Sequence, residues 1–173
     1  MTAIYTIGHS VRPLEDLIAL LLAHGVNGLA DVRTVPKSRR HPHFSRDALE
    51  RSLPAAGVVY RHFAALGGLR KPRSDSANFG WRHEGFRGYA DHMQTAAFAA
   101  AVDELLAFAA ERTVAVMCAE AKWWQCHRRL IADALLARGV TVRHIMTATS
   151  APPHELTPFA RIDGGQVTYP SLI

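Results

Sequence analysis

Short apolar runs alternate with amphipathic helical patterns along almost the whole chain, and no other feature of the sequence limits the fold as strongly. Apolar runs bounded by turn residues are typical of buried strands, whereas apolar residues spaced three and four apart indicate a helix with one apolar face. Strands that alternate with helices favour a mostly parallel sheet with helices on both faces. We therefore predict an α/β fold whose central sheet has about five strands, at residues 3–7, 28–32, 58–62, 114–117 and 140–145.

Helices are predicted between these strands from their apolar stripes and from their start and stop residues. Pro13 suits the first position of a helix, Gly25 suits the position after its end, and Ser45 can cap the next helix. The predicted helices cover residues 13–24, 46–55, 96–111 and 126–138. We expect one domain over residues 1–173, with an irregular basic loop at about 67–88, an irregular tail at about 146–173 and a short edge strand at 166–169.

Composition limits the class of protein to a globular domain. A chain of 173 residues, of which 49% are hydrophobic, is long enough to bury a real core. No run reaches about 18 continuous apolar residues, and the first residues do not resemble a signal peptide. Two cysteines without a secretory signal fit a reducing cytoplasm, so we expect a cytoplasmic protein with no membrane partner. The sequence leaves the oligomeric state open.

Positive charge is concentrated in one part of the chain. Residues 33–87 hold 12 of the 20 Lys and Arg residues and four acidic residues, which gives this segment a charge of +8 within a total of +5. Such a segment favours an anionic partner, either a small phosphate-bearing molecule or a nucleic acid, although a solvated basic surface has the same composition. The candidate nucleic-acid contacts are Lys37, Arg39, Arg40, Arg70, Lys71 and Arg73.

The stretch from Thr113 to Arg129 combines a strand, a loop and a helix start, and it carries most of the chemically reactive groups. Because ligands bind beyond the carboxyl ends of parallel strands, where helix N-termini point, side chains at these ends are the site candidates. For catalysis they are His9 after the first strand, Glu120 after the fourth and Cys126 at the helix start. For binding an anion they are Ser10, Arg33, Ser38, His127 and Arg128.

Each of these candidates also has a structural interpretation. His9 can act as a general acid or base, or it can hold its turn through a fixed hydrogen bond. A thiol in the first turn of a helix, beside a histidine and an arginine, is the setting that lowers a thiol pKa, but Cys126 can also be a packing residue. Cys118, at the end of a buried strand, is expected to be a core residue. Asp31 is expected to form a structural ion pair.

An anion site shared by Arg33 and Arg128 is the strongest of our binding predictions, and an ion pair of Arg128 with Glu120 is its alternative. Planar guanidinium groups bind phosphate at two points, and the free N–H groups of a helix start already favour negative charge. The histidines match no standard metal-site spacing, so we expect no metal and no cofactor. With the strands in the spatial order 3-2-1-4-5, His9 is expected beside the loop that carries Glu120.

Several short motifs resemble those of a known protein family. They are Thr6-Ile7-Gly8-His9-Ser10, Asp31-Val32-Arg33 with Pro36 and Ser38, Leu66-Gly67-Gly68, Gly88-Tyr89, and Cys118-Ala119-Glu120 with Cys126-His127-Arg128. In this order the chain resembles the family catalogued as domain of unknown function 488, over residues 6 to about 145. The resemblance implies a compact α/β domain, and it implies no particular reaction.

Three functional hypotheses follow from the sequence. The first is an enzyme that acts on a phosphate-bearing substrate, a nucleotide or a nucleic acid, at the carboxyl edge of the sheet. The second is a non-enzymatic nucleic-acid-binding module that uses residues 37–87, and the third is a thiol-dependent enzyme or redox sensor that uses Cys126. An enzyme of the first kind loses turnover on Glu120→Gln but keeps its ligand, whereas a binding module loses affinity when Arg39 and Arg40 are changed.

Overall fold

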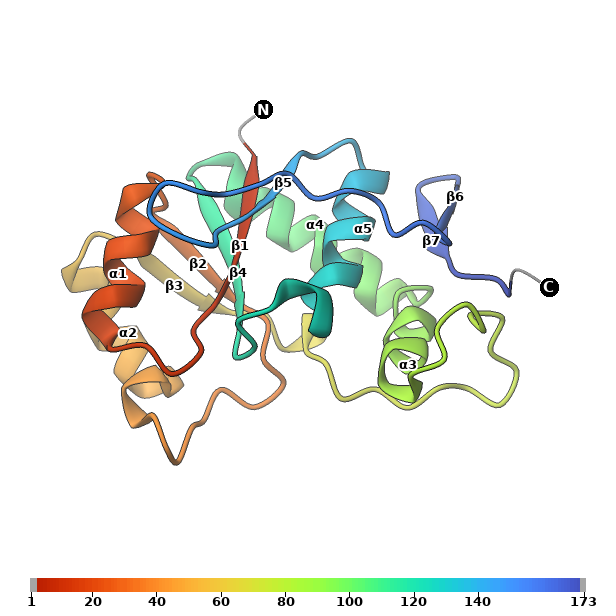
Figure 1. Ribbon diagram of the computed structural model, residues 1–173, viewed down its shortest axis with the longest axis horizontal. Helices are drawn as coiled ribbons and strands as arrows, with labels where there is room; N and C mark the ends of the chain where they lie inside the picture. Colours follow the sequence, from red (N-terminus) through yellow and green to blue (C-terminus); the bar gives the residue numbers. More distant parts are fainter. Residues whose placement is uncertain (1–2, 172–173) are drawn as a thin grey trace.

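The computed structural model describes residues 3–171 and contains a five-stranded parallel sheet with helices on both faces (Figure 1). The sheet strands are β1 (Ile4–Gly8), β2 (Gly28–Asp31), β3 (Val59–His62), β4 (Val114–Cys118) and β5 (Val142–His144). The helices are α1 (Leu14–Ala23), α2 (Arg46–Ala55), α3 (Glu84–His92), α4 (Ala96–Ala110) and α5 (Arg128–Ala137). Single turns of 3₁₀ helix occur at Pro42–Phe44, Ala64–Leu66 and Trp123–Gln125. The predicted single α/β domain with a parallel sheet of about five strands is confirmed.

The spatial order of the strands is β3-β2-β4-β1-β5, so the order expected from the sequence was wrong. β4 lies between β2 and β1, with Ala115 opposite both Leu29 and Tyr5. All five residues of β4 are buried, as a strand that is covered on both faces and paired along both edges requires. β1 contains the half-buried Tyr5 and lies one place nearer the edge. His9 and the loop after β4 are neighbours in either order, because β1 and β4 are adjacent in both.

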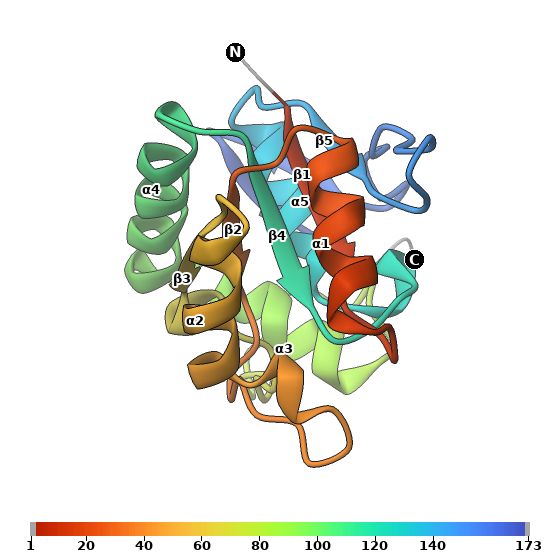
Figure 2. The same ribbon diagram turned by 90° about the vertical axis from the view of Figure 1, so that its left-hand side faces the viewer.

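Alternate residues of the strands separate two hydrophobic cores. Leu29 and Met117 face α1 and α2 on one side of the sheet, whereas Val114 and Val116 face α4 and α5 on the other. Figure 2 shows α1 and α2 together on one face, with α4 on the opposite side of the strands. This arrangement is expected for a parallel sheet, where each face must be covered by the crossover helices.

The segment at about 67–88 is irregular only as far as residue 83, because α3 already begins at Glu84. The imidazole of His83 caps this helix by accepting a hydrogen bond from the Phe86 N–H at 3.4 Å. The sequence does not indicate α3 because it contains Gly88, and glycine has a low helix propensity. A Cβ at this position would lie 2.1 Å from the carbonyl oxygen of Arg70, so the contact between α3 and the preceding loop requires glycine.

The tail contains a separate antiparallel hairpin rather than an edge strand of the main sheet. β7 (Gln166–Thr168) coincides with the strand predicted at 166–169, but it pairs with β6 (Arg161–Asp163). The buried Val167 and Tyr169 fix this hairpin against α5, and so the tail covers the outer face of that helix.

No single helix in residues 3–171 is both long and apolar enough to cross a membrane. Only α3 and α4 together reach the required length, and a bend of 79° separates them.

Candidate active site

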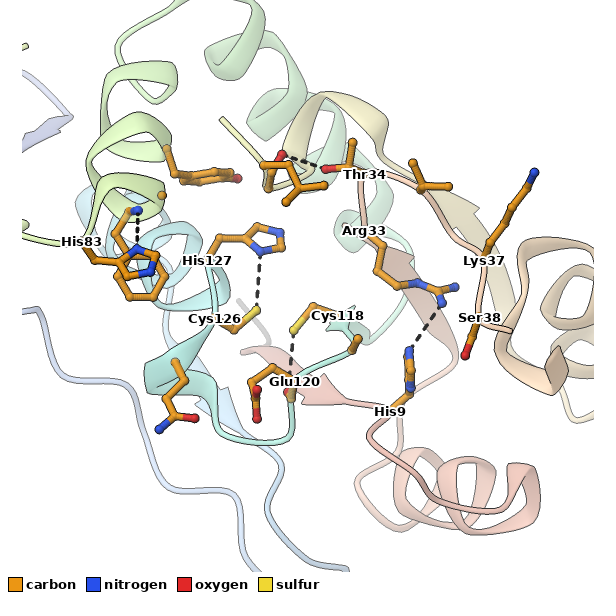
Figure 3. A pocket seen from close by; sticks show the side chains of 18 residues that line it. His9, Arg33, Thr34, Lys37, Ser38, His83, Cys118, Glu120, Cys126 and His127 are labelled. Atoms are coloured by element: carbon orange, nitrogen blue, oxygen red, sulfur yellow. Dashed lines mark hydrogen bonds between the residues drawn. The ribbon is translucent and has the colours of Figure 1, made fainter. Parts of the chain in front are cut away.

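A cavity of about 490 Å³ lies at the carboxyl edge of the sheet, where the loops after four strands meet the starts of α3 and α5 (Figure 3). Its wall is built by segments that are distant in the sequence. The side chains that line it include His9, Arg33, Thr34, Val35, Lys37, Ser38, Leu69, His83, Phe86, Tyr89, Cys118, Glu120, Gln125, Cys126 and His127. Charged groups, thiols, imidazoles and apolar side chains therefore face one cavity that is open to solvent.

Glycine at two positions allows the loops to close around this cavity. A Cβ on Gly8 would lie 1.9 Å from the carbonyl oxygen of Glu120, a separation that no backbone adjustment within the sheet can accommodate. A Cβ on Gly68 would lie 3.1 Å from Nδ1 of His127, which is tighter than ordinary packing. The end of β1 thus packs directly on Glu120, and the loop after β3 packs directly on His127, just before α5. These close contacts fix the positions of both residues.

The sulfur of Cys126 lies in a pocket of hydrogen-bond donors just before α5. It is 3.5 Å from Nδ1 of His127 and accepts a hydrogen bond from the backbone N–H of Arg128, also at 3.5 Å. The side chain of Cys118, at the end of β4, points toward it (Figure 3). Cys126 is only 7% exposed, and the surface that remains faces the cavity. The arrangement is suited to a negatively charged sulfur.

The ring of His127 is held in one orientation by the groups around it. Nε2 is 2.9 Å from the carbonyl oxygen of Val32, which can only accept, so Nε2 carries a proton and donates it. Nδ1 is then free to accept from a thiol or, when protonated, to donate to a thiolate. Tyr89 packs against the ring with centroids 5.1 Å apart, and its own hydroxyl donates to the carbonyl of Leu66 at 2.8 Å.

The pKa values of the two thiols are shifted in opposite directions. The neighbouring Cys118 thiol lowers the pKa of Cys126, and His127 and Arg128 lower it further, whereas burial acts the other way. Burial raises the pKa of Cys118 well above that of a free thiol, and its contact with Cys126 raises it more. The pair is therefore built to hold one thiolate, on Cys126, beside one thiol, on Cys118.

Arg33 and His9 form the opposite wall of the cavity, and most of the guanidinium is already engaged. Asp31 binds Arg33 in bidentate fashion, with Nε to Oδ1 at 2.9 Å and Nη2 to Oδ2 at 2.7 Å, and Nη2 also donates to the carbonyl of Phe44. The structural ion pair expected for Asp31 is present. Only Nη1 points toward the cavity, where it lies 3.4 Å from Nε2 of His9.

The structure shows the turn-holding hydrogen bond that the sequence suggested for His9. Nδ1 donates to the carbonyl of Ser10 at 2.8 Å, which fixes the turn, and the ring stacks on Phe44 with centroids 4.4 Å apart. Burial lowers the pKa of His9 to about 4, so the ring is neutral at pH 7 and Nε2 carries a lone pair. Of the anion-binding candidates near it, Ser38 lines the cavity and Ser10 does not.

Glu120 and Arg128 occupy different environments, and the structure does not bring Arg128 to the cavity. The guanidinium of Arg128 is 1% exposed and donates to the carbonyl of Glu120 at 2.6 Å and to that of Ala121 at 3.3 Å. The exposed carboxylate of Glu120 accepts from the backbone of Lys122 at the cavity rim. Arg33 and Arg128 therefore form no shared anion site, and Arg128 contacts the backbone of Glu120 rather than its carboxylate.

The six candidate nucleic-acid contacts have different environments. Lys37 lines the cavity, and Arg39, Arg40 and Lys71 are exposed. Arg70 is half-buried and donates to the carbonyl of Gly67 at 3.2 Å, and Arg73 forms an exposed ion pair with Asp75 at 3.0 Å. Four of the six, Lys37, Arg39, Arg40 and Lys71, are exposed and form no ion pair with another residue in 3–171.

A buried chain of hydrogen bonds behind α5 was not predicted from the sequence. Thr6 Oγ1 lies 2.6 Å from His144, Nε2 of His144 lies 2.9 Å from His154, and Nε2 of His154 lies 2.8 Å from Asp133. Arg128 contacts the same Thr6 hydroxyl at 3.3 Å, so the chain supports the residue that holds the Glu120 loop. The apolar residues at alternate positions around His144 place it on a buried face, which is the signal that could have identified it.

The donor set in residues 3–171 contains no group of three or more His, Cys, Asp or Glu side chains arranged to hold a metal ion.

Comparison with known proteins gives one match. A family model described as Domain of unknown function DUF488 matches residues 13–135, which span β2, β3, β4 and most of the cavity wall. No curated protein and no solved structure matches the chain.

Proposed function

The chain belongs to the DUF488 family, whose description assigns no reaction, and we propose that it is a thiol-dependent enzyme in which Cys126 attacks a small anionic substrate. One observation carries the proposal: a sulfur surrounded by donors that favour its thiolate form faces a cavity that also presents cationic side chains. A cysteine that only packs against a helix has no need of these donors. Thiolate, not thiol, is the nucleophilic form of cysteine.

The partners of Cys126 correspond to the parts that nucleophilic catalysis requires. A nucleophile needs an adjacent base in a fixed orientation, and the base needs a third group that orients it. His127 is the base at 3.5 Å, and the carbonyl of Val32 orients it through Nε2. The start of α5 adds one backbone N–H to the sulfur, and the partial positive charge of a helix N-terminus favours the thiolate.

The opposite wall of the cavity supports an anionic substrate. Lys37 and Ser38 lie across the cavity from the two thiols, and Nη1 of Arg33 points in beside them (Figure 3). Between these two walls, Val35, Leu69 and Phe86 supply apolar surface. A molecule with an anionic end, an apolar body and an electrophilic centre near Cys126 matches this distribution, and a phosphate-bearing substrate meets the first requirement.

The reaction follows from the positions of Cys126 and His127. The sulfur of Cys126 forms a bond to the electrophilic atom of the substrate while the bond to the leaving group breaks, and the leaving group takes the proton on Nδ1 of His127. Water then attacks the same atom, Nδ1 takes a proton from that water, and the bond to sulfur breaks. The thiolate and the protonated ring are restored. Glu120, at the rim, is a second acceptor for the water proton.

Alkylation by iodoacetamide, followed by mass spectrometry of the two cysteine peptides, tests this proposal. At pH 7 we expect Cys126 to be modified before Cys118, because only Cys126 is a thiolate. Cys126→Ser should abolish the fast reaction. Inorganic phosphate should slow it in the wild type but not in Lys37→Ala, and Lys71→Ala, which removes an equal charge away from the cavity, should keep the protection.

Each result decides one part of the proposal. Equal rates at the two cysteines would exclude Cys126 as the nucleophile. Fast modification that phosphate does not slow would leave the nucleophile in place but exclude an anionic substrate bound by Lys37.

Nucleic-acid binding is a second candidate function, favoured by the position of the basic loops. Residues of two loops, at 34–35, 37–38 and 68–69, line the cavity, and the exposed Arg39, Arg40 and Lys71 lie one or two residues further along the chain. A polyanion that contacts both loops would lie across the cavity mouth. Binding of this kind must weaken steeply with salt, because each bound cationic side chain displaces condensed counterions.

A further inference from the structure

We propose that Cys118 is a resolving residue, so that a small hydroperoxide converts Cys118 and Cys126 into a reversible disulfide that switches the site off. The inference rests on the proposed function in one respect, the nucleophilic thiolate of Cys126. It adds a role for Cys118, which the substrate reaction does not use, and a class of oxidant.

The two side chains are placed for this reaction by elements that the fold holds rigidly. Cys118 ends the central strand β4, and Cys126 directly precedes the first turns of α5, so seven residues separate them in the chain. Their sulfurs face each other on the cavity wall (Figure 3). The loop between them is fixed by Arg128, which donates to the carbonyls of Glu120 and Ala121.

Cys118 belongs to the hydrophobic core behind the cavity, and its thiol also has polar neighbours. Its thiol donates to the carbonyl of Glu120 at 3.7 Å, and its side chain points toward the sulfur of Cys126 (Figure 3). A residue that merely fills the core would be surrounded by apolar groups, whereas Cys118 lines a cavity that contains His9, Arg33 and His127. Cys118 therefore both packs in the core and faces the sulfur of Cys126 across the cavity wall.

Access restricts the oxidant to a small molecule. Cys118 is 3% exposed and Cys126 is 7% exposed, and the exposed atoms open into the cavity. The low exposure of both sulfurs favours a small oxidant such as a hydroperoxide over a disulfide on the surface of another protein. A thiol reductant that restores the pair must be small for the same reason.

The chemistry balances with one hydroperoxide and no other oxidant. The Cys126 thiolate attacks the outer oxygen of ROOH, the O–O bond breaks, and the departing RO⁻ takes the proton on Nδ1 of His127 to give ROH. Cys126 is then a sulfenic acid. The sulfur of Cys118 attacks the sulfur of Cys126, the S–O bond breaks, and the hydroxide leaves as water with the proton of the Cys118 thiol. The two sulfurs lose two electrons in total, which the peroxide gains.

The test is stoichiometric hydrogen peroxide on the full-length protein, with intact mass and peptide mass measured before and after dithiothreitol. The wild type should lose the mass of two hydrogen atoms, contain a peptide that links Cys118 to Cys126, and recover both thiols and fast alkylation after reduction. Cys118→Ser places a hydroxyl of similar size beside Cys126 but cannot form the disulfide. With one equivalent of peroxide this variant should gain one oxygen atom at Cys126, and with excess peroxide it should gain two, which reduction does not reverse.

Three outcomes separate this inference from the proposed function. Gain of oxygen by the wild type without loss of hydrogen, at the same peroxide dose as Cys118→Ser, overturns the role of Cys118 and leaves a reactive Cys126 in place. Disulfides between two copies of the chain overturn it as well. No reaction of Cys126 with either peroxide or iodoacetamide overturns both proposals together.

Discussion

Removal of the charge on Asp31 should destabilise the protein more than removal of any surface carboxylate. The carboxylate is fully buried and accepts from the guanidinium of Arg33 at 2.7 and 2.9 Å, from the Arg33 backbone at 3.1 Å and from the hydroxyl of Tyr60. Asp31→Asn preserves the shape of the side chain, but it leaves Arg33, which is 7% exposed, with no negative charge beside it.

The expected magnitude follows from the burial of both groups. Breaking a buried ion pair by removing one partner costs about 3–5 kcal/mol, because the remaining charge is uncompensated. The amide oxygen of asparagine still accepts one of the hydrogen bonds, so we expect a value near the lower limit. For a chain of 173 residues the unfolding entropy is roughly 0.36 kcal/mol/K, so the melting temperature should fall by roughly 8–14 °C.

Urea unfolding of Asp31→Asn and of a matched control measures this effect. Glu50→Gln removes the same charge from an i, i+4 pair with Arg46 at 2.8 Å, in which both side chains are exposed. Such pairs contribute about 0.3–0.5 kcal/mol. If the two variants lose similar stability, the buried pair does not stabilise the loop that carries Arg33, and our description of this cavity wall is incorrect.

Three further predictions concern acid stability, the approach of the loops and nucleic-acid binding. Burial lowers the pKa values of His9 and His144 to about 4 and about 3, so below pH 6.5 the unfolded chain binds protons that the folded chain does not. The free energy of unfolding should therefore fall by roughly 2 kcal/mol per histidine from pH 7 to 5, and urea denaturation that gives the same free energy at both pH values would contradict this. Gly8→Ala should prevent cooperative folding, because its Cβ would lie 1.9 Å from the carbonyl oxygen of Glu120. A variant with the circular dichroism spectrum and urea midpoint of the wild type would contradict this close approach of β1 to the Glu120 loop. If nucleic acid binds the basic loops, replacing Arg39 and Arg40 by alanine should lower the slope of log K against log salt by roughly 2, and an unchanged slope would remove both residues from the interface.

The sequence predicts the elements of this fold better than their arrangement. The helix at 46–55 has both predicted bounds because its apolar stripe is clear, and Ser45 is at its N-cap position although the serine side chain makes no capping hydrogen bond. The strand order was wrong because a buried apolar run shows that a strand is covered on both faces but not which strand lies beside it. The irregular loop was predicted to continue to about residue 88, past the start of α3 at Glu84, because Gly88, which the packing against Arg70 requires, has low helix propensity.

At the candidate site, the rule that ligands lie beyond the carboxyl ends of parallel strands correctly predicts which residues lie together. It places His9, Arg33, Glu120 and Cys126 together, and the structure finds all four on one cavity. The same rule fails for Arg128, which lies in the first turn of a helix. Its spacing of three and four from the buried Ile131 and Ala132 already puts it on the inward face, and helical periodicity therefore outweighs proximity to the strand ends.

The contacts that define the thiol pair could not be predicted from spacing alone. Cys118 and Cys126 are separated by a loop whose course depends on the guanidinium of Arg128, and nothing local in the sequence specifies that contact. The same holds for the buried chain from Thr6 to Asp133, which joins residues far apart in sequence through histidine rings.

The central claim is that Cys126 is a thiolate at neutral pH, and titration of its ultraviolet absorbance measures this directly. The difference spectrum between the wild type and Cys126→Ser reports that sulfur alone when it is followed from pH 9 to acid. We predict that the thiolate absorbance is complete at pH 7 and disappears only under acid conditions, well below about 8.5, the ordinary pKa of a thiol. A difference that disappears around pH 8.5 would show an ordinary thiol at Cys126 and would contradict both the proposed function and the disulfide switch.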